Sequence, residues 1–188
     1  MAIVIKSGRE IELMRRAGRV VAEALDLAGR LVKPGITTEA IDRAVGDLII
    51  SRDCKIAFKG LYGFPANSCI SINEQVVHGI PGKRRLKEGD IVSVDVGTRY
   101  KNYHGDGART FPVGQVSEED EKLMRVCRES LERGIGVIRA GVPLTEVSAA
   151  IQRHVEGNGF SVVRKYVGHG IGIEFHEEPQ IPNFVEKG

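Results

Sequence analysis

The 188-residue sequence is poor in cysteine and has no long apolar run. Its three cysteines, Cys54, Cys69 and Cys127, are odd in number and form no CxxC pair, which argues against a disulfide framework and favours a reducing cytosol. The sequence contains no apolar stretch of about 18 residues, the length that a membrane-spanning helix needs. The first residues, Met1–Ser7, lack the layout of a signal peptide. We therefore expect a cytoplasmic protein without a membrane partner.

An excess of charge of one sign is also missing. The net charge is +2 at pH 7, and basic residues are interspersed with acidic ones, so no nucleic-acid surface is indicated. The densest basic run, Lys83–Arg85, is short and typical of a solvated loop. With 188 residues and 41% hydrophobic content, the chain can bury a sizeable core.

Helical patterns occur in two pairs. The capping box Ser7–Glu10 predicts a helix that stops at Pro34–Gly35, and a second helix follows Thr37. The same layout recurs after Ser117, with a helix that ends at Ala140–Gly141 and a fourth helix behind it. Each pair is followed by a strand-like segment, Ser68–Ile72 in the first half and Ser161–Val167 in the second.

A shift of 106 residues aligns the two helix pairs, because Leu25 then coincides with Leu131 and Ile41 with Val147. This agreement predicts an internal duplication within one domain spanning 1–188. The first repeat covers about 7–113, and the second covers about 117–188. A chance likeness between helix–turn–helix units is the alternative. Since the counterpart of Ile91 would lie beyond Gly188, the symmetry also predicts a truncated second repeat.

Two aspartates, Asp95 and Asp106, form the first candidate site. The segment Ile91–Gly97 alternates as a strand does, with its valines on one face and Asp95 on the other. If the chain reverses near Tyr100–Lys101, the two aspartates lie opposite each other on antiparallel strands, with Cβ atoms about 4.5–5.5 Å apart. Carboxylates so close repel unless a cation lies between them. The pair indicates half of a metal site, and a solvated acidic hairpin is the alternative.

Two histidines lie seven residues apart, at His169 and His176. In a regular strand they would face opposite ways, but Gly170 and Gly172 allow a bend or bulge that brings both imidazoles into one cavity. Imidazole and carboxylate together are ligands for divalent first-row metals. With the two aspartates, His169 favours a metal site over a histidine that merely packs in a core.

Five motifs, in the same order and at the same intervals, resemble type I methionine aminopeptidases: Asn67–Glu74, Val77–Pro81, Asp95 with His104–Asp106, Gly168–Gly172 and Phe175–Pro179. The resemblance covers nearly the whole chain and is to the short bacterial form. It implies an α/β fold of the pseudo-twofold "pita-bread" type, with the second half incomplete in this chain.

The resemblance implies a role for each matching residue. Asp95, Asp106 and His169 match ligands of a site for two divalent metal ions, which could be Co, Mn, Fe or Zn. A water between the metals would be the nucleophile.

Two more histidines match catalytic residues that contact substrate. His176 matches the histidine that hydrogen-bonds the scissile amide and stabilises the tetrahedral intermediate, and His78 matches one near the scissile nitrogen. Soft, apolar walls suit a thioether, and three residues match the walls of the methionine pocket: Cys69, Phe64 and Phe175.

The sequence departs from the family pattern in two places. Leu61 occupies a position where the family has tyrosine, and the adjacent Tyr62 is a candidate to compensate. The family also has two further glutamate ligands, one of them the presumed general base, beyond the position of Gly188. We therefore expect the 188-residue chain alone to be inactive.

The implied function is removal of the N-terminal methionine from nascent polypeptides, by a monomer that could associate with the ribosome. A proline-specific aminopeptidase of the same fold is the first alternative, which the Asn67–Glu74 and His78 motifs disfavour. A non-catalytic peptide-binding fragment is the second alternative, which the retained aspartates and histidines disfavour.

Overall fold

The computed structural model describes residues 3–185. They form two compact units. The amino-terminal unit comprises residues 4–117 together with the segment 171–175. The carboxy-terminal unit comprises residues 118–170, the described residues from 176 onward and residue 3. No helix within residues 3–185 is both long and apolar enough to cross a bilayer.

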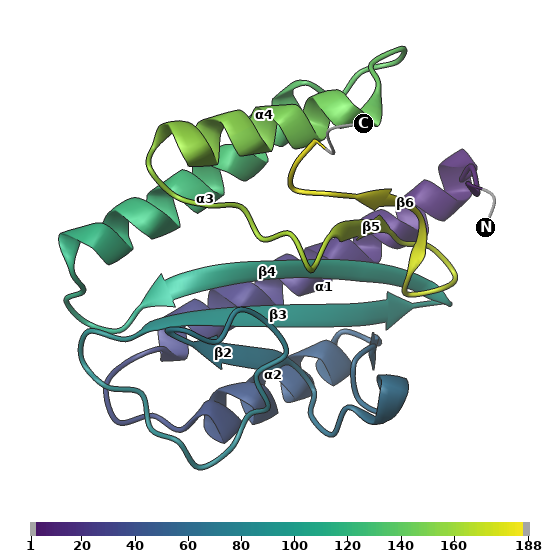
Figure 1. Cartoon of the computed structure of the whole chain (residues 1–188). Coiled ribbons are helices and arrows are strands. Elements are labelled where there is room, and N and C mark those ends of the chain that lie inside the picture. The colour runs from purple at the N-terminus through teal and green to yellow at the C-terminus, as the bar shows by residue number, and fades with distance from the viewer. Residues whose placement is uncertain (1–2, 186–188) are drawn as a thin grey trace. The chain divides into compact units, whose positions relative to one another are not determined.

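The amino-terminal unit is a helix pair packed on an antiparallel sheet (Figure 1). Strand β3 pairs with β4 along one edge and with β1 and β2 along the other. The elements in chain order are α1 (Gly8–Leu31), α2 (Thr38–Ser51), β1 (Lys55–Ile56), a 3-10 turn (Leu61–Gly63), β2 (Cys69–Ile72), β3 (Ile91–Tyr100) and β4 (Tyr103–Pro112).

Helix α1 begins at the predicted capping box. The Ser7 hydroxyl accepts a hydrogen bond from the Glu10 N–H, and the Glu10 carboxylate accepts one from the Ser7 N–H at 2.7 Å. The helix ends at Leu31, just before the turn at Pro34–Gly35, and the Thr37 hydroxyl caps α2 by accepting a hydrogen bond from the Ala40 N–H. Both predicted helices of the first half are thus confirmed.

The core of this unit lies between the helices and one face of the sheet. Alternate residues of β3 point into it, and Val92, Val94 and Val96 are fully buried. Gly105 on β4 lets α1 approach closely, because a Cβ there would lie 2.7 Å from the Ala17 carbonyl carbon. The opposite face of β3 therefore carries the intervening residues, including Asp95.

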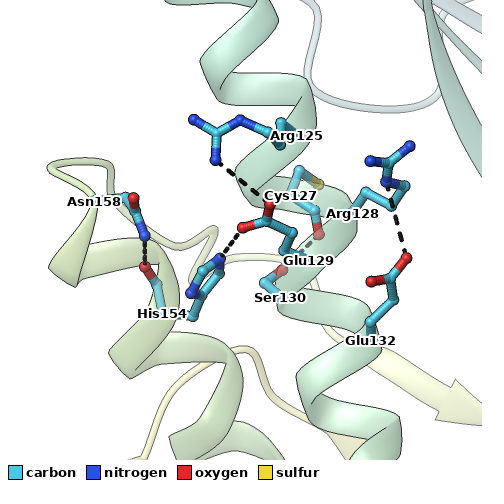
Figure 2. A network of polar contacts seen from close by, with 8 residues as sticks. All are labelled: Arg125, Cys127, Arg128, Glu129, Ser130, Glu132, His154 and Asn158. Atoms are coloured by element: carbon cyan, nitrogen blue, oxygen red, sulfur yellow. Dashed lines mark hydrogen bonds and ion pairs between the residues drawn. The ribbon is translucent and has the colours of Figure 1, made fainter.

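The carboxy-terminal unit contains α3 (Glu118–Gly136), α4 (Leu144–Gly157), β5 (Gly168–Gly170) and β6 (Glu177–Ile181). The two helices are joined by a hydrogen bond between His154 Nε2 and Glu129 Oε2 at 2.9 Å, and Arg125 donates to the same carboxylate (Figure 2). Burial acts to raise the pKa of Glu129, but the hydrogen bonds and the charges of Arg125 and His154 together lower it.

Two expectations for this unit are wrong. Helix α3 ends at Gly136 rather than at Ala140–Gly141, because Gly134 and Gly136 weaken the helix near its end. The segment Ser161–Val167 is not a strand. Among the described residues no strand pairs with it, and the Asn183 side chain instead donates to the carbonyls of Val163 and Tyr166.

Helices α2 and α4 have the same length, 14 residues, and α4 begins and ends 106 positions after α2. This is the interval that the sequence predicts between the repeats. The duplication of the two halves stays a prediction.

Candidate metal and substrate site

The β3–β4 hairpin turns through two residues, Lys101 and Asn102. Both have positive φ angles, 45° and 72°, as a tight two-residue hairpin turn requires. The turn pairs Tyr100 directly with Tyr103, whose hydroxyl donates to the Glu10 carboxylate at 2.6 Å. The predicted reversal of the chain is therefore present, one residue later than expected.

This turn makes the predicted opposition of the two aspartates wrong. Asp95 lies opposite Ala108, and Asp106 lies opposite Gly97. Direct opposition would have required Tyr100 to pair with Lys101, which leaves no residue to form the turn. The aspartates are instead diagonal neighbours on one face of the sheet, where such pairs lie about 7–8 Å apart.

The surroundings of the two carboxylates disfavour two negative charges. Burial raises the pKa of Asp95 to about 7, and the charge of Asp106 adds to the increase, although the Val96 N–H opposes it. The Oδ1 atom of Asp106 is also buried. A bound cation would remove this cost, so the pair favours a cation site over a solvated acidic hairpin.

Because the pKa of Asp95 is raised, we expect the metal-free protein to lose stability as pH rises. The Asp95 carboxyl has its ordinary pKa of 3.8 when the chain is unfolded, but a pKa of about 7 when the chain is folded. Ionisation of the buried Asp95 carboxyl lowers the free energy of unfolding. This loss is absent below pH 3.8, grows between pH 3.8 and 7, and reaches at most about 4 kcal/mol. In urea unfolding with chelator present, Asp95→Asn should stabilise the protein more at pH 8 than at pH 5. A gain independent of pH would contradict this prediction.

The chemistry of the donors fits a divalent ion, and the three predicted ligands come from two units of the chain. Within residues 3–185, no group of three His, Cys, Asp or Glu side chains lies close enough together to hold a metal. The amino-terminal unit supplies Asp95 and Asp106, and the predicted imidazole ligand, His169, belongs to the other unit. The assignment of all three as ligands stays a prediction.

An aromatic cluster lies beside the carboxylates. Cys69 on β2 is directly opposite Asp95 on β3 and packs with buried Phe58 and Phe175. We call this the aromatic cluster; its partly buried members are Ala57, Leu61 and Phe64. Burial, followed by the charges of Asp95 and Asp106, raises the pKa of the Cys69 thiol to about 12, so the thiol is neutral at physiological pH. The cluster thus offers an apolar surface next to the carboxylates.

The structure brings the three predicted pocket residues into this cluster, but sequence reasoning missed its central member. Phe58 contacts Phe175 and Phe64 edge-to-face, with ring centroids 5.4 and 6.4 Å apart. Leu61 packs against the cluster, whereas Tyr62 is 87% exposed and does not take the place of the family tyrosine. A signal for Phe58 was available in Gly97, since a small residue in a strand often marks a close approach.

Gly97 makes room for the two central rings. A Cβ at this position would lie 2.6 Å from Phe58 Cε1 and 3.0 Å from Phe175 Cε2. We expect Gly97→Ala to lower the free energy of unfolding by about 1–3 kcal/mol through overpacking, as measured in urea. Gly18→Ala is the matched control, because Gly18 in α1 has open space around it and alanine favours a helix. Equal effects of the two changes would contradict the packing explanation.

His78 is exposed and held at the edge of β2. Its φ angle is 61°, and the next residue, Gly79, lies against the strand. Gly79 accepts a hydrogen bond from the Ile70 N–H at 2.8 Å and donates to the Ser71 hydroxyl at 3.1 Å. A Cβ on Gly79 would lie 2.1 Å from the Ile70 carbonyl oxygen, so only glycine fits there. These contacts place His78 beside the strand that carries Cys69.

The two histidines of the carboxy-terminal unit lie side by side. The ring centroids of His169 and His176 are 4.4 Å apart, and a bulge between His169 and Gly170 interrupts the β5–β6 pairing, which confirms the predicted irregularity. His169 Nδ1 donates to the Gly170 carbonyl at 2.9 Å. That tautomer keeps the lone pair on Nε2, which is the form in which imidazole binds metals.

The segment between these histidines belongs to the amino-terminal unit. The His104 N–H donates to the Gly172 carbonyl at 2.9 Å, and the His104 ring contacts Phe175 edge-on at 5.5 Å. Phe175 thereby joins the aromatic cluster, although it lies 117 positions after Phe58 in the chain.

Comparison with known proteins adds an independent result. Residues 12–188 match the sequence model of metallopeptidase family M24. A methionine aminopeptidase of Clostridium perfringens is 51% identical over 186 residues, which are 99% of this chain and 75% of that protein. The crystal structure of the Thermotoga maritima methionine aminopeptidase gives a TM-score of 0.97 at 47% identity, covering 100% of this chain and 76% of that one.

The prolidase of Pyrococcus furiosus shares the fold alone. Its TM-score is 0.83 at 23% identity, and the match covers 98% of this chain and 53% of the prolidase. The relatives at high identity are therefore methionine aminopeptidases rather than proline-specific enzymes. The chain has the pita-bread fold and belongs to metallopeptidase family M24, among the methionine aminopeptidases.

Proposed function

We propose that this chain takes part in metal-dependent removal of the N-terminal methionine from polypeptides. One observation carries the proposal. Cys69 of the aromatic cluster and Asp95 of the carboxylate pair are directly opposite residues on neighbouring strands. A methionine side chain in contact with the cluster would thus bring its own peptide bond next to the carboxylates. The relationship to methionine aminopeptidases agrees with this arrangement.

Asp95, Asp106 and His169 would hold the metal, which we propose to be two divalent ions from among Co, Mn, Fe and Zn. Two carboxylates and an imidazole suit these metals. When bound, such ions supply Lewis acidity, which brings the pKa of water toward neutrality and polarises a carbonyl. The carboxylates also offset the positive charge, so asparagine would not replace them.

The other residues would bind substrate and stabilise charge. The neutral thiol of Cys69 and the rings of Phe64 and Phe175 would contact the methionine thioether, which soft apolar surfaces bind well. His176 would donate a hydrogen bond where negative charge develops on the scissile amide, and His78 would lie near its nitrogen.

The substrates would be the N-termini of nascent chains, met in the cytoplasm by a monomer that could associate with ribosomes. The cysteines Cys54, Cys69 and Cys127 are all free, which supports a reducing compartment.

The test uses two proteins. The first is residues 1–188. The second, which we call the joined protein, is residues 1–188 followed by the quarter of the Clostridium perfringens relative that lies outside the match. We expect the joined protein with divalent metal to release methionine from Met-Ala-Ser, and chelator to abolish the release. Pro-containing dipeptides are the control substrates. For residues 1–188, calorimetry should show Mn²⁺ binding that Asp95→Asn weakens. A joined protein that folds but cleaves only the Pro-containing substrates would refute the proposal.

A further inference from the structure

Helix α2 holds one end of the loop that forms the aromatic cluster. This loop, residues 57–68, carries Phe58, Leu61 and Phe64 and leads directly into Cys69 on β2. Its first residue is attached to the sheet, because the Ala57 N–H donates to the Gly97 carbonyl at 3.0 Å. Its last two residues, Asn67 and Ser68, are attached to a single side chain of α2.

That side chain is Asp42. Its Oδ1 atom accepts from the Asn67 N–H at 3.0 Å, the Ser68 N–H at 2.7 Å and the Ser68 hydroxyl at 2.8 Å. Its Oδ2 atom accepts from Asn67 Nδ2 at 2.9 Å, and the Asp42 carbonyl accepts from the same nitrogen at 3.3 Å. Hydrogen bonds to a charged acceptor are stronger than neutral ones. One carboxylate therefore binds both residues that precede Cys69.

Two further features show that this junction is tightly built. Ser68 is fully buried, so its hydroxyl and N–H depend on protein partners. Gly46, one helical turn after Asp42, has no side chain where a Cβ would lie 2.7 Å from Asn67 Nδ2. The helix thus leaves space for the Asn67 amide to lie against it.

We propose that Asp42 is a positioning residue for the methionine pocket, holding the loop and Cys69 at the place where the side chain of the substrate binds. Asp42 touches neither the carboxylate pair nor the reacting atoms in this assignment and acts through Asn67 and Ser68. That the aromatic cluster binds methionine rests on the proposed function. That Asp42 fixes the position of the loop and of Cys69 does not depend on it.

The first experiment measures how well Cys69 is protected, and needs no catalytic activity. Residues 1–188 are treated with iodoacetamide, and alkylation of each cysteine is followed by mass spectrometry of peptides. Asp42→Asn keeps the size of the side chain but turns an amide N–H₂ toward a donor, so alkylation of Cys69 should accelerate about tenfold. Because the Asp42 charge also contributes to the raised pKa of the Cys69 thiol, Asn67→Ala is measured as well. It removes hydrogen bonds of the junction but keeps that charge, and it should also accelerate alkylation of Cys69. Cys54, buried in the main core, should stay unchanged and reports general unfolding.

Asp47→Asn is the matched control, because it removes the same charge from an exposed position of the same helix. It should leave the alkylation rates of both Cys54 and Cys69 unchanged. Parallel acceleration of Cys54 and Cys69 in Asp42→Asn would reveal loss of general stability and overturn the positioning role. An unchanged rate at Cys69 would overturn it as well.

A second experiment tests the link to substrate. Free L-methionine should slow alkylation of Cys69 in the parent chain and have less effect in Asp42→Asn. In the joined protein, Asp42→Asn should raise KM for Met-Ala-Ser about tenfold and change kcat less than about threefold. A lower kcat with unchanged KM would overturn the positioning role. If methionine does not protect Cys69 even in the unmutated residues 1–188, the assignment of the methionine pocket fails. The effect of Asp42→Asn on the alkylation rate of Cys69, compared with that of Cys54, still tests whether Asp42 fixes the loop.

Discussion

Replacement of Asp106 by asparagine is expected to lower metal affinity at least about 100-fold, because loss of groups that merely support a ligand already costs about 10–100-fold. The amide keeps the shape of the side chain but removes a negative charge that would offset the cation. The Asp106 carboxylate has a buried oxygen and lies diagonally across from Asp95. Mn²⁺ titration calorimetry measures the affinity, and methionine release by the joined protein at limiting metal measures activity.

The control for this change is Asp26→Asn. Asp26 is also a carboxylate of the amino-terminal unit, but its side chain is 56% exposed in a surface ion pair with Arg109. Surface pairs contribute little to stability, and metal affinity should be unaffected. Near-normal activity of Asp106→Asn at limiting metal would show that the hairpin is not the metal site.

Removal of the His176 imidazole is expected to lower kcat of the joined protein about 10²–10³-fold, the usual effect of losing one hydrogen-bond donor that stabilises a developing negative charge. Metal content should be unchanged, since His176 is proposed to contact substrate rather than metal. Its ring lies beside that of His169, with centroids 4.4 Å apart, so the experiment must separate the two roles. Elemental analysis after gel filtration gives the metal content, and initial rates on Met-Ala-Ser give kcat.

His154→Ala tests whether any histidine of the carboxy-terminal unit would have the same effect. His154 joins α4 to α3 through Glu129, and circular dichroism can correct for the folded fraction. Its kcat per folded molecule should stay close to that of the parent. A His176→Ala protein isolated without metal would instead identify His176 as a ligand.

The β3–β4 hairpin illustrates how far local pattern extends. Alternation along Ile91–Gly97 correctly predicts which residues face the core, because side chains in a strand alternate with period two. It does not determine the partner across the strand. The conformation of Lys101 and Asn102 decides that, and it moves Asp106 from opposite Asp95 to opposite Gly97.

The segment Ser161–Val167 shows the same limit for whole elements. Its β-branched residues favour a strand, but a strand forms only when another backbone pairs with it, and among the described residues none does. Helix positions were more predictable, since capping and apolar spacing are local. Thr37 and the Ser7–Glu10 box mark the first two helices correctly.

By itself, the sequence determined the helices of the first half and the buried face of β3, and it supplied the residue types that we propose for a metal site and a thioether pocket. These depend on neighbours within a few positions, or on motifs whose order and spacing are visible in one dimension. Only the tertiary structure decided that Phe58 and Phe175 share one cluster, that Cys69 lies opposite Asp95, and that the Asp42 carboxylate fixes the loop between them. Such contacts join residues far apart in the chain, and packing and strand register select them only when the whole unit folds.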